Sequence, residues 1–288
     1  MDRLVGGFLV LVLGLSGAAA EDKPAIPAEQ YEALVKEYHA ASVVFYSRAK
    51  TDAERNQILA SVDKFPLRFL ELAEKNPQDP IALDALVQVI TQEISLENNT
   101  SHPGFGKDSR EARAIAILLR DHIGSDRLGD ACKRVHYGFR QECESFLRTV
   151  LEKSPHREVQ AMACLRLALF LEYRSLRLDL LQGQPEMAKR YEGWFGKVYV
   201  DKLRRQDRIQ VVKQTEALFE QAIEKYADVK VPYGGTVGEA AESELYEIRH
   251  LSIGKPALDT VGEDQDGQQF QLSDYRGKVV LLYFWSEY

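Results

Sequence analysis

The feature that most limits the fold of this chain is a helical spacing of apolar residues that continues, with short breaks, from Pro27 to His250. In the first stretch, Ala28 to Lys50, the apolar positions fall on one face of a helix. Polar links separate stretches of comparable length, and short links favour antiparallel neighbours. The pattern therefore predicts a mainly α fold, with a bundle of helical hairpins over residues 21–252.

Capping residues and proline mark the expected helix boundaries. Thr51 to Glu54 and Thr236 to Glu239 match the capping box, in which a threonine and a glutamate satisfy each other's backbone N–H groups. Asp79 and the segment Asp108 to Glu111 are further predicted helix starts. Pro66 lies inside a helical pattern, so we expect that helix to be kinked or split.

Residues 161–171 predict the most buried helix, because only Arg166 interrupts ten apolar residues. The segment Leu218 to Tyr226 is similar to the second helix of a tetratricopeptide repeat. No clean 34-residue period accompanies it, so this similarity rests on one segment.

After Ser252 the composition shifts toward glycine, proline and aspartate, which divides the chain into a helical domain (residues 21–252) and a second part (residues 253–288). Asp266-Gly267 is a tight-turn dipeptide, and Gln269 to Leu272 alternates as a hairpin strand does. Val279 to Trp285 is apolar, β-branched and aromatic throughout, which predicts a strand buried on both faces. Without neighbouring strands this part should promote aggregation.

Three blocks of sequence follow one another in this second part. They are Ile253-Gly254-Lys255-Pro256-Ala257, the segment from Gly262 to Lys278, and Phe284-Trp285-Ser286. In this order they resemble the opening of exported thioredoxin-like proteins, the TlpA-like and AhpC/TSA (redoxin) group. Leu258 stands where that family has a second proline, and the resemblance covers about 36 of the 288 residues.

The resemblance implies a thioredoxin-like α/β domain that begins with this hairpin and strand. In the family a C-x-x-C motif follows the strand; its first cysteine attacks as a thiolate and its second resolves the mixed disulfide. Here the motif would start after Tyr288. We therefore expect residues 253–288 to be an N-terminal fragment of the domain and this chain by itself to be inactive. Truncation, a selenocysteine codon read as a stop and a naturally short chain are the explanations left open.

The N-terminus has the pattern of a secretory signal peptide over residues 1–20. Arg3 precedes an apolar stretch from Leu4 to Leu15, and Ala18-Ala19-Ala20 follows as a cleavage site. The apolar stretch is too short for a stable membrane span, and an uncleaved anchor is the alternative. We expect an exported protein of the periplasm or cell envelope.

The three cysteines are Cys132, Cys143 and Cys164, an odd number for an oxidising compartment. Cys164 lies in the most apolar helix and is expected in the core. Cys132 and Cys143 would be about 16 Å apart along one continuous helix, beyond the reach of a disulfide. A turn at Gly138 would let them pair; two buried thiols are the other interpretation.

No residue pattern predicts a catalytic, cofactor-binding or metal-binding site in this chain. The six histidines show no spacing typical of metal ligands. Gly234 to Gly238 lacks the lysine of a phosphate-binding loop and is better explained as a helix cap. The net charge of −7 leaves no basic surplus for nucleic acid.

The resemblance implies a thiol–disulfide oxidoreductase or a peroxiredoxin-related antioxidant protein, acting on a protein or peroxide substrate, with the redox motif missing from this chain. The alternative is a non-enzymatic helical scaffold that binds another exported protein.

Overall fold

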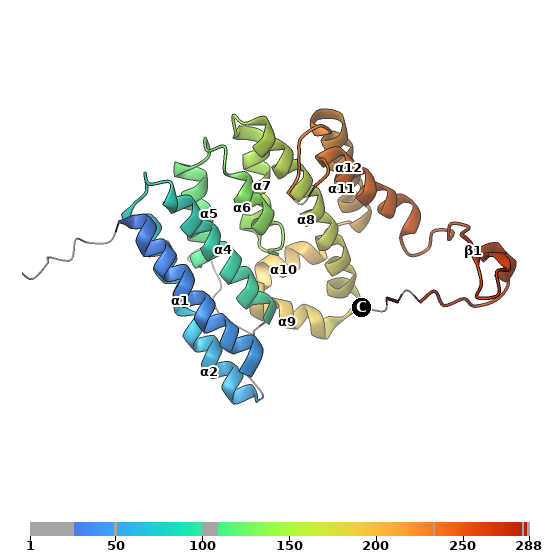
Figure 1. Ribbon diagram of the computed structural model, residues 1–288, viewed down its shortest axis with the longest axis horizontal. Coiled ribbons are helices and arrows are strands. Elements are labelled where there is room, and N and C mark those ends of the chain that lie inside the picture. The colour runs from blue at the N-terminus through green and yellow to red at the C-terminus, as the bar shows by residue number, and fades with distance from the viewer. Residues whose placement is uncertain (1–25, 49–50, 100–108, 233, 284, 287–288) are drawn as a thin grey trace, which may run out of the picture.

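The computed structural model describes residues 26–48, 51–99, 109–232, 234–283 and 285–286, and the fold is mainly helical (Figure 1). The predicted signal peptide, residues 1–20, lies outside the described residues. The helices are α1 (Pro27–Arg48), α2 (Asp52–Val62), α3 (Lys64–Lys75), α4 (Ile81–Asn99), α5 (Arg110–Asp121), α6 (Gly129–Val135), α7 (Gln141–Lys153), α8 (Arg157–Gly183), α9 (Pro185–Phe195), α10 (Lys197–Arg204), α11 (Arg208–Tyr226) and α12 (Val237–Tyr246). The π-helical turn η1 (Glu247–Leu251), the strands β1 (Val261–Glu263) and β2 (Gln269–Gln271) and the 3-10 helix η2 (Leu272–Tyr275) follow.

Helices that follow one another in the chain largely pack beside one another, in a row from α1 to α12 (Figure 1). Helix α3 packs against α4, α4 against α5, and α7 against α8. Helix α8 also packs against α11, which in turn packs against α12. Helices α9 and α10 pack against each other and against α8.

Helix α8 is central to this row, as the apolar run 161–171 predicts. One side of it, with Leu167 and Phe170, belongs to a main core shared with α3 to α7. The other side, with Leu165 and Ala168, belongs to a second core shared with α11 and α12. Burying a leucine or phenylalanine side chain contributes about 1.5–3 kcal/mol each. Packing on two sides therefore explains why residues 161–171 of this helix include only one polar residue, Arg166.

The predicted helix starts are confirmed. Thr51 and Thr236 are the N-caps of α2 and α12, each in a complete capping box. Ser109 caps α5. At the start of α4 the backbone N–H of Ile81 donates to Asp79 Oδ1 at 2.9 Å. These boundaries depend on contacts within one helical turn, so the local sequence suffices to predict them.

Three further helix boundaries lie at Asp63, Gly196 and Tyr246. The helix expected to be kinked or split at Pro66 is split, but the break falls at Asp63. Pro66 lies in the first turn of α3, where backbone N–H groups have no acceptor within the helix, so the N–H that proline lacks removes no helical hydrogen bond. Helices α9 and α10 are separated by Gly196, whose φ of +80° suits glycine. The last α-helix, α12, ends at Tyr246, and the chain continues as the π-helical turn η1.

The predicted hairpin is confirmed, because β1 and β2 pair antiparallel with Gly262 opposite Phe270. The prediction of a strand from Val279 to Trp285 is wrong for the residues described there. Residues 279–283 and 285 form no strand, and Leu281 is 89% exposed. A strand needs a partner for its backbone groups, and within the described residues β1 and β2 pair only with each other.

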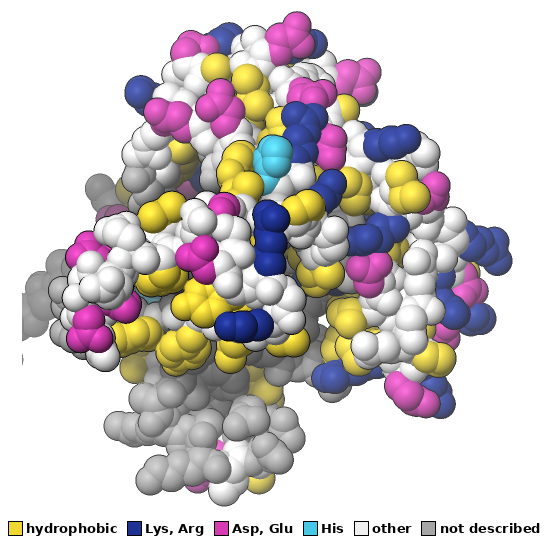
Figure 2. All heavy atoms as spheres, turned by 90° about the vertical axis from the view of Figure 1, so that its right-hand side faces the viewer, with side chains coloured by type: hydrophobic (Ala, Val, Ile, Leu, Met, Phe, Trp, Pro, Cys, Tyr) yellow, Lys and Arg dark blue, Asp and Glu magenta, His cyan; other side chains and the backbone are white. Residues whose placement is uncertain are grey.

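No helix in the described ranges is both long enough and apolar enough to cross a membrane. On the face of the molecule in Figure 2, acidic and basic side chains are interspersed with hydrophobic ones.

Candidate functional site

The three cysteines are buried thiols that form no disulfide. Burial raises the pKa of Cys132 and that of Cys164 to about 12. The thiolate is the reactive form of cysteine, and a buried thiol with a raised pKa supplies almost none of it. Cys132 and Cys143 could form a disulfide or remain two buried thiols, and the structure shows the buried thiols.

Cys143 lies beside a buried carboxylate. Its Sγ donates to Glu111 Oε1 at 3.2 Å, and Glu111 Oε2 forms an ion pair with Arg140 Nε at 2.8 Å. The Glu111 side chain is fully buried and that of Arg140 nearly so. The Cys143 side chain is itself fully buried, and a reactive thiol needs access to its substrate. The surroundings of Cys143 therefore suit a structural role and not a nucleophile.

The C-terminal part is organised around short-range polar contacts. Asp264 Oδ1 accepts the backbone N–H groups of Asp266 and Gln268 at 2.9 and 2.8 Å, which closes the hairpin turn. A side-chain carbon at Gly262 would lie 2.9 Å from the ring of Phe270, the residue opposite it on β2. Glycine at this position therefore leaves room for the Phe270 ring to pack against β1.

A pocket of about 290 Å³ lies between η2 and the segment after it. Val280 and Leu282 line this pocket and are 42% and 58% exposed. Val279, Leu281 and Tyr283 alternate with them along the chain and are 103%, 89% and 79% exposed. Alternate residues therefore face opposite sides, as they do in a strand, although this segment is unpaired.

A larger depression, which we call the loop groove, lies in the helical part. Its volume is about 440 Å³. Its walls come from the α5–α6 loop, α6, the start of α8 and the α11–α12 loop. The lining residues are Asp126, Arg127, Gly129, Asp130, Lys133, Glu158, Val159, Met162, Val229, Lys230, Val231 and Pro232.

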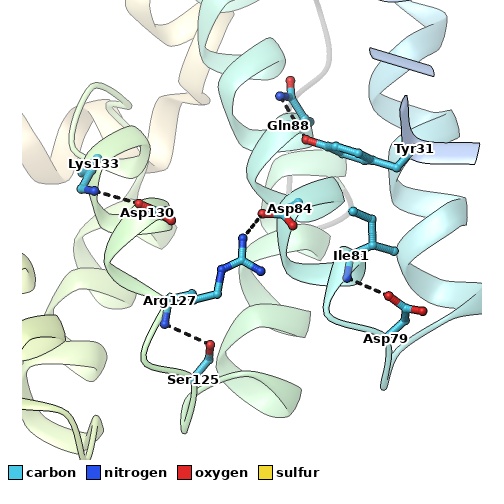
Figure 3. Close-up of polar contacts among 9 residues, drawn as sticks. All are labelled: Tyr31, Asp79, Ile81, Asp84, Gln88, Ser125, Arg127, Asp130 and Lys133. Carbon is cyan, nitrogen blue, oxygen red and sulfur yellow. Dashed lines mark hydrogen bonds and ion pairs between the residues drawn. The ribbon is translucent and has the colours of Figure 1, made fainter. Parts of the chain in front are cut away.

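The α5–α6 wall of the loop groove is fixed by side chains that reach across elements. Arg127 forms an ion pair with Asp84 on α4, and its backbone N–H donates to Ser125 Oγ at 3.2 Å (Figure 3). His156, just before α8, holds the carbonyl oxygen of Gly124 through Nε2 at 2.9 Å. These contacts hold the α5–α6 loop against both α4 and α8.

The opposite wall is fixed by Arg157 and by glycine. Arg157 Nη2 donates to Asp228 Oδ1 at 2.6 Å and to the carbonyl oxygen of Lys225 at 2.8 Å. A side-chain carbon at Gly238 would lie 2.9 Å from both Cα and Cβ of Ala227, so glycine lets the start of α12 approach the end of α11 closely. The α11–α12 loop is thereby held over the start of α8.

The loop groove has an apolar floor and a rim of mixed charge. Val159, Met162 and Val229 are at most 7% exposed. On the rim, Lys133 forms an ion pair with Asp130 at 2.7 Å (Figure 3). The described lining contains no serine, cysteine or histidine. Its composition suits binding of a ligand or peptide with apolar and charged groups.

The buried histidine His136 has a structural environment. Arg166 Nη1 lies 3.5 Å from its Nε2, and because arginine can only donate, this nitrogen accepts. Burial, followed by the charge of Arg166, lowers the pKa of His136 to about 3. Gly234 to Gly238 forms the turn and cap of α12, as the sequence indicates. In the described part of the chain, no three His, Cys, Asp or Glu side chains are grouped so that they could hold a metal ion.

Sequence reasoning did not find the loop groove. Its residues come from segments as far apart as Asp126 and Pro232 and share no motif. The only local signal is the turn at Gly234-Gly235, which marks the loop but not what the loop covers. No protein-family model matches this chain, and comparisons with curated proteins and with solved structures give no significant match.

Proposed function

We propose that residues 253–288 are the opening of a thioredoxin-like domain and that the protein takes part in thiol–disulfide exchange or peroxide reduction outside the cytoplasm. The support is the resemblance of three sequence blocks to redoxins. One observation adds to it: a closed β-hairpin leads into an extended apolar segment whose residues alternate between two sides. Such a segment is ready to serve as a sheet strand once strands flank it.

On this proposal the reactive pair is not formed by Cys132, Cys143 or Cys164, because all three are buried in the helical part. Thiol–disulfide exchange needs a thiolate that reaches the substrate disulfide. The helical part would instead position the redoxin part or its substrate.

The test uses the protein produced from its own gene with the natural flanking DNA, after its intact mass has been measured. Reduction of insulin disulfides in the presence of a thiol donor should exceed the uncatalysed rate. A variant with Cys132, Cys143 and Cys164 all replaced by alanine should keep that activity. Loss of activity in this variant, or no activity in the natural product, would contradict the proposal.

A second proposed function is a non-enzymatic helical scaffold. The loop groove favours it, because a volume of about 440 Å³ with an apolar floor and a rim of mixed charge is suited to docking. A photoreactive residue placed at Val231 on the rim should give one discrete adduct in the native host. The same residue at Val198, which is 87% exposed but not part of the groove, is the control. Equal adducts at both positions, or none at Val231, would rule out the groove as the docking site.

A further inference from the structure

The C-terminal half of α8 carries an exposed apolar surface. Tyr173, Leu176 and Leu180 are spaced three and four residues apart, so they lie on one side of the helix. They are 40%, 59% and 38% exposed. Tyr137, just after α6 and 50% exposed, stacks on Tyr173 with ring centroids 6.5 Å apart. These four residues form what we call the α8 stripe. Adjacent exposed tyrosine and leucine side chains are typical of an interaction surface.

Three carboxylates border the α8 stripe. Glu172 precedes Tyr173 and lies one helical turn from Leu176, and Glu244 and Glu247 come from the end of α12 and the start of η1. The three interact electrostatically with one another, and burial together with Glu244 and Glu247 raises the pKa of Glu172 to about 7. Within the described chain, none of these carboxylates has a hydrogen bond or an ion pair.

Two neighbouring arginines form no ion pair with these carboxylates in the described structure. Arg249 forms ion pairs with Glu216 and Glu220 of α11. Arg166 acts electrostatically on Glu244 but forms no ion pair with it in the described structure. The α8 stripe therefore lies beside an excess of negative charge.

We infer that the α8 stripe docks a basic amphipathic helix of a partner protein. Apolar side chains of that helix cover the stripe, and its lysine or arginine side chains reach Glu172, Glu244 and Glu247. The faces of Tyr137 and Tyr173 add cation–π contacts to the same cations. This inference names a partner for the scaffold function proposed above and does not depend on the redox activity.

The charge of this surface argues against two other occupants. A second copy related by a twofold axis would bring the same carboxylates together and repel itself. An anionic membrane surface would also be repelled, since such surfaces attract basic segments. A basic helix is the occupant that satisfies both the apolar side chains and the carboxylates.

The test measures binding of a fluorescent synthetic peptide of 18 residues, made of leucine and lysine placed so that one helical face is apolar. A peptide with glutamate in place of lysine and one with the same leucine and lysine residues scrambled are the reference probes. The full chain should bind the first peptide at least about tenfold more tightly than either reference, and added salt should weaken the binding.

Two variants examine the surface itself. Substitution of Glu172, Glu244 and Glu247 by glutamine, or of Leu176 and Leu180 by glutamine, should each weaken binding about tenfold. The matched control replaces Glu32, Glu152 and Glu224 by glutamine; these are exposed residues of α1, α7 and α11 and change the net charge equally. The control should bind as the unaltered protein does.

Several outcomes would overturn the inference: equal weakening in the control, no weakening in either variant, or no binding at all. Concentration-dependent self-association that Leu176→Gln and Leu180→Gln abolish would assign the surface to a second copy. Binding to anionic vesicles through the same residues would assign it to lipid. If a variant fails to fold, the test instead uses a photoreactive form of the leucine–lysine peptide, crosslinked to the unaltered protein. Crosslinks between residues 173 and 180 support the inference, and crosslinks confined to other helices contradict it.

Discussion

A side-chain carbon on Gly138 would lie 2.6 Å from the sulfur of Cys143, closer than side-chain carbons approach other atoms in proteins. It would also lie 3.2 Å from the carbonyl oxygen of Val135 and 3.3 Å from Glu111 Oε1. The turn after α6 therefore depends on the absence of a side chain, so that a thiol and a buried carboxylate can occupy that space.

Gly138→Ala should lower the free energy of unfolding by about 1–3 kcal/mol, because overpacking a filled core strains its neighbours. Urea denaturation measures this loss. Adding Cys143→Ala should recover part of it, since the closest contact is removed. Gly124→Ala is the control, because a side chain there would meet no atom within 4 Å. Independent effects of the two substitutions would show that the contact between 138 and 143 is not the cause.

Two arginines that bind the same carboxylate should differ widely in their contribution to stability. Arg174 is 2% exposed and binds Glu144 Oε2 at 2.5 Å and the hydroxyl of Tyr199 at 3.2 Å. Arg148 is 47% exposed and binds Glu144 Oε1 at 2.8 Å. Arg174→Met should lower the free energy of unfolding by about 3 kcal/mol, as expected when a buried ion pair loses one partner. Arg148→Met should cost no more than about 0.5 kcal/mol. Similar losses in urea denaturation would contradict this assignment.

The three thiols should react only when the protein opens. With the pKa of Cys132 and that of Cys164 near 12, the thiolate fraction at pH 8 is on the order of 10⁻⁴. An aromatic disulfide reagent should therefore label the native protein more than about a hundredfold more slowly than it labels glutathione. Dilute urea should accelerate labelling of all three together. Rapid labelling of one cysteine without denaturant would show that it is accessible.

Stability should depend on pH through Glu172. Its pKa of about 7 in the folded protein exceeds the ordinary 4.5, so the folded state holds a proton that the unfolded chain releases. The free energy of unfolding contributed by this group therefore falls as the pH rises from about 4.5 to 7. Glu172→Gln should stabilise the protein above pH 7 by on the order of 1 kcal/mol, after allowance for solvent screening. Denaturation at pH 5 and pH 8 measures this, with Glu32→Gln as the control that should not alter the difference.

The exposed segment after η2 should drive self-association. Val279→Lys with Leu281→Lys changes side chains that are 103% and 89% exposed, and should shift the protein toward monomer in sedimentation. Val198→Lys with Ile209→Lys adds the same charge at 87% and 65% exposed positions in the helical part. If this control disperses the protein equally, net charge and not the segment is responsible.

The parts of the fold that could be predicted from sequence are those that depend on nearby residues. The capping boxes at Thr51 and Thr236 each close within one turn, and the hairpin at Asp266-Gly267 closes within a few residues. The burial of α8 follows from its own apolar composition. The spacing of apolar residues and the residue types found in turns indicate these helices and turns directly.

The remaining features depend on residues far apart in the chain. The break between α2 and α3 falls at Asp63, where Arg110 Nη1 donates to the Asp63 carbonyl oxygen at 2.8 Å from 47 positions away. The loop groove likewise arises where separate helices and loops meet, and no single segment encodes it. Three residues of the α8 stripe lie on one helix, but Tyr137 and two of the bordering carboxylates come from other parts of the chain. The Val279 to Trp285 segment shows that local composition alone is not sufficient either. Its composition favours a strand, but a strand forms only where a neighbouring strand can pair with it.

The contact between Cys143 and Glu111 has a consequence for how the chain matures. The carboxylate and the surrounding helices shield the sulfur only after α5 and α7 have come together. Before that moment nothing in the nascent polypeptide distinguishes these thiols from any others. In an oxidising compartment, the yield of intact protein would depend on the rate at which the helices pack together relative to the rate at which a cysteine is oxidised.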